Sequence, residues 1–169
     1  NVTLARLTAD LVGAFRRLNG LLLPVPYPDK FYDEAVTDRV AGAVTIVALW
    51  WDGGPPGKEG AETGGSHGPG QPPASPATGS TGTIPPPTLY ISTLAVLAPF
   101  RHLGLAAHLV AAATVRGAAL FGCRHVAAHV WAANEEARAW YRRRGFGEEG
   151  RDEAYYARLR PKAAVCVRK

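Results

Sequence analysis

A short motif of basic and small residues, Arg101-x-x-Gly104-x-Ala106, stands where a predicted strand gives way to a predicted helix. The first N–H groups of a helix have no partner within the helix and carry partial positive charge. Gly104 and Ala106 leave these groups accessible because they have little or no side chain, and Arg101 adds a permanent charge. The motif therefore predicts a cradle for a diphosphate, with a glycine spacing unlike that of Rossmann or Walker loops.

Two other residues, Tyr90 and His129, have side chains that can handle a proton. Each falls on a predicted strand, and the two strands can be neighbours in one sheet. Imidazole titrates near neutral pH and suits proton acceptance, whereas a phenol is a poor base and better suited to orienting water. Each residue on its own also has a purely structural interpretation, as a half-buried strand tyrosine or a hydrogen-bonded core histidine.

The elements that must position these residues are read from apolar spacing and turn residues. Pro99 ends the strand before the motif because it cannot donate to a ladder, and Gly122 closes the long helix after it. Asn134 is predicted to cap the last helix, and Gly145 to follow that helix in a left-handed conformation. The predicted elements are a strand at 89–97, a helix at 101–121, a strand at 124–132, a helix at 134–144 and a strand at 155–159 with a tail to 169.

The N-terminal part predicts a strand, two helices and a second strand. Thr8 is expected to cap the first helix, Asn19-Gly20 to end it, and Asp29 to cap the second. Between them lies a proline-rich loop, which is either a connector or a binding loop whose stiffness lowers the entropy cost of holding one shape. The predicted elements are a strand at 2–7, a helix to residue 18, the loop at 21–28, a helix at 30–38 and a strand at 41–51.

Residues 53–87 are low in complexity and rich in Gly and Pro, so they predict a flexible insertion within a single domain at 1–169. Lys and Arg number 19 against 14 Asp and Glu, a net charge of +5, which suits a nucleic acid, an anionic cofactor, a ribosomal surface or an ordinary solvated face. Cys123 and Cys166 have no metal-ligand spacing, which predicts free thiols and no metal site.

No leader peptide or membrane-length apolar run is visible, so we expect a cytoplasmic protein, also nuclear in part.

The stretches 18–32, 89–106 and 129–146, together with Tyr155-Tyr156, resemble the GNAT acetyltransferase superfamily and, within it, protein N-terminal acetyltransferases of the NatE type. The resemblance implies an α+β fold with a central, mostly antiparallel sheet, a splayed strand pair and flanking helices. It also implies an antiparallel strand pair before the cofactor strand, of which the sequence predicts one member.

The activity implied by this resemblance is acetyl transfer from acetyl-CoA to the N-terminal amine of proteins that keep Met before an apolar residue. The transfer would be direct, in a ternary complex, with Tyr90 and His129 acting together as base through ordered water. An α-amine has a pKa near 7.7–8.0, against about 10.4 for lysine, so it needs only a weak base.

The resemblance further implies cofactor and peptide contacts. Leu94 N–H would stabilise the oxyanion, Tyr141 would protonate the leaving thiolate or only pack, and Asn134 would add a cofactor contact to its capping role. Leu23 stands where an aromatic residue is typical. The cofactor set is Leu94, Val96, Arg101, His102, Gly104, Leu105, Ala106, Ala107, Asn134 and Tyr141, and the peptide set is Leu23, Pro24, Val25, Tyr27, Ser92, Tyr155 and Tyr156.

Two other functions are kept as hypotheses. One is a weakly active or inactive scaffold subunit of the ribosome-associated NatA complex, whose auxiliary and catalytic subunits would be partners. The other is a small-molecule amine acetyltransferase, which would use acidic residues to hold a cationic amine, whereas the Leu23-Pro24-Val25 loop is apolar. Neither a membrane nor a specific nucleic acid is expected as a partner.

Overall fold

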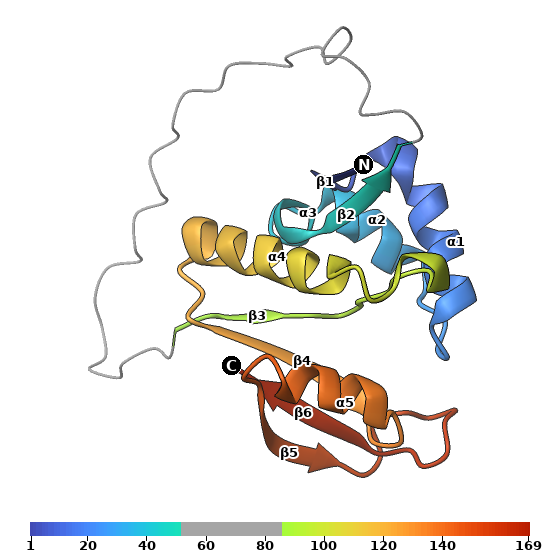
Figure 1. The fold of residues 1–169 in the computed structure, drawn as a ribbon, viewed down its shortest axis with the longest axis vertical. Coiled ribbons are helices and arrows are strands. Elements are labelled where there is room, and N and C mark those ends of the chain that lie inside the picture. Colours follow the sequence, from blue (N-terminus) through green and yellow to red (C-terminus); the bar gives the residue numbers. More distant parts are fainter. Residues whose placement is uncertain (52–85) are drawn as a thin grey trace, which may run out of the picture.

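The structure is a computed structural model that describes residues 1–51 and 86–169. Within these residues the strands form two sheets, one of two strands and one of four, and helices pack against both (Figure 1). The predicted α+β class with a mostly antiparallel arrangement is confirmed, and one strand pair, β3 with β4, is parallel. Apart from residues 86 and 87, the insertion predicted at 53–87 lies outside the described residues.

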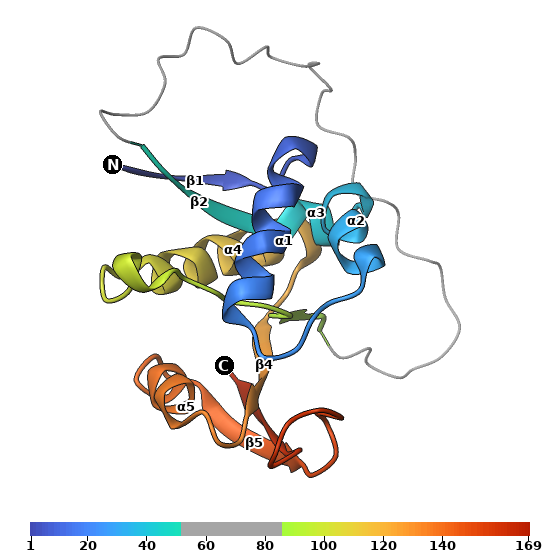
Figure 2. The ribbon, with the colours of Figure 1, turned by 90° about the vertical axis from the view of Figure 1, so that its right-hand side faces the viewer.

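The N-terminal layer is built on β1 (Val2–Arg6) and β2 (Ile46–Trp50), which pair antiparallel along their whole length. Two helices, α1 (Val12–Leu22) and α2 (Asp29–Thr37), lie beside each other in this layer (Figure 2). Aromatic side chains make the contact between them. The ring of Phe15 lies 6.2 Å from that of Phe31 and 5.7 Å from that of Tyr32. The remaining elements of the layer are η1 (Ala9–Leu11) and α3 (Ala41–Val44).

Three predicted helix boundaries in this layer are wrong. Thr8 precedes η1 and makes no side-chain capping bond. Helix α1 passes through Asn19-Gly20 and ends at Leu22, because Leu23 precedes a proline and is held extended at φ −98° and ψ 137°. Asp29 is the first residue of α2 instead of its cap, and its carboxylate pairs with Arg16.

The strand predicted at 41–51 is also wrong in its first half, which forms the short helix α3. The carboxylate of Asp38 accepts hydrogen bonds from the N–H groups of Val40 and Ala41, at 2.9 and 2.7 Å, and so begins a helical turn. Gly42 fits there because a Cβ atom would lie 2.7 Å from the carbonyl oxygen of Val36. Among the described residues, β2 is the only strand between β1 and the strand β3 (Thr88–Tyr90).

The C-terminal sheet has the strand order β3-β4-β6-β5 and contains most of the core. Strands β3 (Thr88–Tyr90) and β4 (His125–Trp131) are parallel, and the other pairs are antiparallel. Helix α4 (Leu105–Phe121) packs on β3, where a Cβ atom at Gly117 would lie 3.4 Å from Leu89. The other elements are η2 (Ala98–Phe100), α5 (Glu135–Arg142), β5 (Gly147–Asp152) and β6 (Ala164–Arg168).

The predictions for the C-terminal third miss two strands. The tail after residue 159 contains β6, whose Ala164 and Val167 are fully buried, whereas 155–159 is bent and belongs to no strand. Strand β5 lies on the edge of the sheet and is exposed along its length, so it has no apolar alternation to reveal it. The sheet partner β6, and not an intrinsic preference, makes this segment a strand.

The thiols of Cys123 and Cys166 are both free. Within 1–51 and 86–169, no helix is long and apolar enough to cross a bilayer, and no group of His, Cys, Asp and Glu is arranged to hold a metal.

Candidate active site

The site lies at the fork where β3 and β4 separate. The two strands pair from Thr88↔His125 to Tyr90↔Ala127, and one more bond follows, from Ile91 N–H to the carbonyl of Ala127 at 2.8 Å. Beyond this point β4 continues against β6, while residues 91–97 run extended outside any ladder of the described chain. The strand predicted at 89–97 is therefore cut short at Tyr90, and the fork opens beside Tyr90 and His129.

Three side chains meet at this fork. The hydroxyl oxygen of Tyr90 lies 2.9 Å from Nδ1 of His129 and 2.9 Å from the hydroxyl oxygen of Tyr155. The ring of Tyr155 also stacks on the imidazole of His129, with centroids 4.4 Å apart and planes 12° from parallel. The structure thus brings together the two residues predicted as catalytic and one that was predicted only for the peptide groove.

The phenol of Tyr90 is kept in its neutral form. Burial raises its pKa far above the ordinary value of 10.0, and the hydrogen bond between the hydroxyls of Tyr90 and Tyr155 raises it further. A tyrosinate at this position is strongly disfavoured. Tyr90 can therefore relay or orient a proton, but it cannot serve as the base, because only the tyrosinate form could do so. The imidazole of His129 is the group in this cluster that can end a proton transfer as the charged partner.

The motif Arg101 to Ala106 forms the turn before α4 and the first residues of that helix. His102 and Gly104 are both left-handed, with φ of 63° and 81°, so the helix begins at Leu105 and not at the predicted Arg101. Among the described residues no side chain caps α4, and its first turn contains no acidic residue. The N–H groups at the start of α4, those of Leu105, Ala106 and Ala107, suit the diphosphate of a CoA-type ligand.

The segment 91–97 connects the fork to the turn before α4. Arg101 Nε donates to the carbonyl oxygen of Val96 at 3.0 Å. This bond uses the carbonyl of a residue that was predicted to contact the cofactor. Asn134 caps α5 as predicted, accepting from Ala137 N–H at 3.0 Å. Tyr141 is 6% exposed and packs edge-on against Phe146, and burial raises its pKa to about 12. Its phenol therefore remains a proton donor at neutral pH.

The loop predicted as a peptide groove connects α1 to α2 and is fastened to the fork. Tyr27 donates to the carbonyl of Ser92 at 2.5 Å and stacks on Phe31 at 4.2 Å. Tyr156 packs edge-on against Tyr155, and burial, with the nearby phenols, raises its pKa to about 12. Burial and the phenol of Tyr155 also raise the pKa of Tyr27. Leu23, Pro24 and Val25 precede Tyr27 on the same loop.

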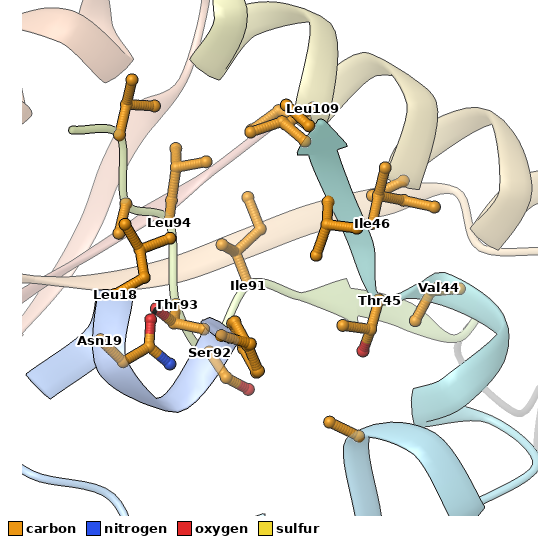
Figure 3. A pocket seen from close by; sticks show the side chains of 18 of the residues that line it. Leu18, Asn19, Val44, Thr45, Ile46, Ile91, Ser92, Thr93, Leu94 and Leu109 are labelled. Carbon is orange, nitrogen blue, oxygen red and sulfur yellow. Dashed lines mark hydrogen bonds between the residues drawn. The ribbon is translucent and has the colours of Figure 1, made fainter. Parts of the chain in front are cut away.

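A hollow of about 620 Å³ separates β2 from residues 91–97. It is lined mainly by apolar side chains of α1, β2, α4 and the extended segment (Figure 3). Asn19 lies on its wall at 3% exposure; Oδ1 accepts a long bond of 3.4 Å from Thr93, and Nδ2 has no partner within the described chain. One signal of this hollow was present in the sequence. The resemblance implies a pair of strands before the strand at 89–97, and the apolar pattern predicts only one of them.

Residues 26–146 match the model of the acetyltransferase (GNAT) family. No curated protein sequence matches the chain significantly. Among solved structures, Arabidopsis thaliana Naa50 in complex with the bisubstrate analogue CoA-Ac-MVNAL is 23% identical, with a TM-score of 0.71 over 99% of this chain and 97% of that one.

Two further structures are similar over 99% or more of this chain. The NatC complex bound to Gag peptide and CoA is 18% identical, with a TM-score of 0.70 over 99% of this chain and 97% of that one. Arabidopsis thaliana NAA60 in complex with acetyl-CoA is 16% identical, with a TM-score of 0.69 over 100% and 99%. These likenesses establish the fold, and the family model establishes that the chain belongs to the GNAT family of acetyl-CoA-dependent acetyltransferases.

Proposed function

We propose that this protein acetylates the N-terminal α-amine of proteins that keep Met before an apolar residue. The observation that carries the proposal is the contact of Tyr90 with His129 at the strand fork, beside a tyrosine-bordered apolar loop. The similar Naa50 structure, whose bisubstrate analogue contains the peptide MVNAL, supports this substrate class.

The residues of the chain have separate tasks in this reaction. The N–H groups at the start of α4 and Arg101 would hold the diphosphate, and Leu94 N–H would face the carbonyl of the bound thioester. When bound, acetyl-CoA would supply the activated acetyl group. Tyr90 relays or orients the proton that leaves the amine, His129 accepts it, and Tyr141 would stand as the proton donor for the thiol end of the cofactor.

The groove favours an apolar first side chain over a cationic substrate. Leu23, Pro24 and Val25 offer only apolar side chains, and Asp29, the first carboxylate after them, is paired with Arg16. A histidine base also favours an α-amine. The pKa of an α-amine, 7.7–8.0, lies closer to the ordinary pKa of imidazole than the pKa of a lysine side chain does. Small polyamines and lysine side chains are therefore expected to be poor substrates.

Release of CoA from acetyl-CoA tests the proposal with a peptide panel. We expect the greatest turnover with Met-Leu peptides, less with Ser- or Ala-initial peptides, and little with spermidine. His129→Ala should suppress release with the Met-Leu peptide. A preference for spermidine would instead support the small-molecule alternative.

The scaffold alternative is tested by calorimetry with acetyl-CoA, because an inactive subunit does not need the cradle. Binding heat together with peptide turnover supports the enzyme, whereas absence of binding favours the scaffold. We also expect association with NatA subunits near the ribosome in the cytoplasm, and co-purification of tagged protein with ribosomes tests this.

A further inference from the structure

Tyr155 makes two contacts that a residue of the peptide groove does not need. Its hydroxyl is within 2.9 Å of the Tyr90 hydroxyl, and its ring lies flat on His129. It reaches the fork from the connection between β5 and β6, 65 residues along the chain from Tyr90. With 42% of its surface exposed, Tyr155 is also accessible from outside the protein.

The hydrogen bonds of this cluster can run in two directions. In the first, Tyr155 donates to the oxygen of Tyr90, and Tyr90 donates to the lone pair on Nδ1 of His129. In the second, Nδ1–H donates to Tyr90, Tyr90 donates to Tyr155, and Tyr155 donates outward. The two arrangements differ by one proton position at every step, so they are the states before and after one proton has entered at Tyr155.

We propose that Tyr155 is the outer end of a proton path through Tyr90 to His129, and that the amine of the acceptor peptide gives up its proton at Tyr155. This inference rests on the proposed function, because it assumes that the substrate is a protonated amine. It differs from a role in the peptide groove, where Tyr155 would affect binding and not proton transfer.

The transfer balances in protons and charge. One N–H bond of the ammonium breaks and one O–H bond forms at Tyr155. The former Tyr155 proton passes to the oxygen of Tyr90, and the former Tyr90 proton passes to Nδ1 of His129. Each phenol ends with one proton, as it began, and the positive charge moves from the amine to the imidazole.

The surroundings favour this course over a charged tyrosine. The raised pKa of Tyr90 disfavours a tyrosinate, so the protons must move together along the path. The imidazolium that forms lies over the face of the Tyr155 ring, whose quadrupole attracts a cation. Tyr155 thus lies at both ends of the path: its hydroxyl receives the proton of the amine, and its ring faces the imidazole that becomes charged.

Tyr155→Phe is the deciding variant because it removes the hydroxyl and keeps the stacked ring. We expect kcat with a Met-Leu peptide to fall at least about tenfold, with the peptide KM within about twofold of wild type. The matched control is Tyr32→Phe, which removes a hydroxyl from a tyrosine on α2 outside the cluster and should leave kcat unchanged. An unchanged kcat in Tyr155→Phe, or a change in KM alone, would overturn the proposal.

A second readout does not depend on activity. Nitrogen NMR of His129 at a pH where the ring is neutral reports which ring nitrogen bears the proton. We expect a bare Nδ1 in the wild type and a larger Nδ1–H population in Tyr155→Phe, because Tyr90 is then free to accept. The same tautomer in both proteins would overturn the hydrogen-bond path, whereas a wild type that turns over no peptide would refute the proposed function alone.

Discussion

The two halves of the molecule are packed to different degrees. In the C-terminal sheet, Ala164 and Val167 are fully buried, and β4 has four buried residues among its seven. In the N-terminal layer, no residue of β1 or β2 is buried, and a hollow of about 620 Å³ separates β2 from residues 91–97. The fork lies on the border between the dense half and the hollow one.

This difference separates two tasks. His129 is fixed between the buried Ala128 and Val130 on β4, so the proton acceptor is held by the dense half. The loop that precedes Tyr27 belongs to the N-terminal layer and is tied to the fork by one hydrogen bond to Ser92. Proton transfer needs a fixed geometry, whereas a groove for varied peptides can tolerate adjustment.

The largest effect should come from breaking the fixed half of the site. His129→Ala is expected to lower kcat by about 100-fold or more, because it removes the proton acceptor. Val25→Ala, on the loop of the hollow half, should instead raise the peptide KM and leave kcat within a few-fold. Steady-state kinetics with acetyl-CoA and a Met-Leu peptide measure both. Equal losses of kcat in the two variants would contradict the division of tasks.

A matched pair of valines tests the packing difference itself. Val167→Ala removes two methyl groups from a fully buried site on β6 and should lower the free energy of unfolding by about 2 kcal/mol. Val47→Ala makes the same change on β2 at the wall of the hollow and should cost less than about 1 kcal/mol, because fewer contacts are lost. Urea unfolding of both variants measures the difference, and similar costs would mean that the hollow is filled in solution.

Local signals in the sequence predicted much of the dense half. Asn134 caps α5, and Gly122 and Gly145 adopt the left-handed conformation expected after a helix. The end of β3 was not predictable in this way, because residues 91–97 are apolar enough for a strand and differ from one only in having no ladder partner within 1–51 and 86–169. Strand partners are decided by the tertiary fold, as they are for β5.

The candidate site was predictable in its residue types more than in its contacts. Tyr90 and His129 fell on strands predicted to be neighbours, and the structure brings their side chains to 2.9 Å. The contacts of Tyr155 join residues 26 and 65 positions apart, and no local pattern encodes such a separation. The buried amide nitrogen of Asn19, which has no partner among the described residues, was also missed, because an Asn before Gly is typical of a helix end.

Asn19 offers a way to stabilise the hollow half. Asn19→Leu removes a buried amide nitrogen that has no partner in the described chain and adds apolar volume at the wall of the hollow. We expect the free energy of unfolding to rise by about 1 kcal/mol. Thr93→Val is the control, because it removes only the long 3.4 Å bond to Asn19 and should change stability little. A destabilised Asn19→Leu variant would indicate that the amide has a partner in solution.

The smallest effect should come from the surface of the dense half. Arg138 Nη2 lies 3.0 Å from Glu148, and this hydrogen bond lowers the pKa of the Glu148 carboxyl below its ordinary 4.5. A carboxyl whose pKa is lowered by folding contributes stability above the pKa of the unfolded state and loses it as the pH falls through the folded value. Unfolding free energies measured from pH 7 down to pH 3 should therefore fall less steeply in Glu148→Gln than in wild type, with a difference below about 1 kcal/mol.

The control is Glu149→Gln, which removes a neighbouring charge with a longer, 3.5 Å ion pair to Arg168 and should change the slope less. If Glu148→Gln instead cost as much as Val167→Ala, surface charge and not burial would be what distinguishes the dense half.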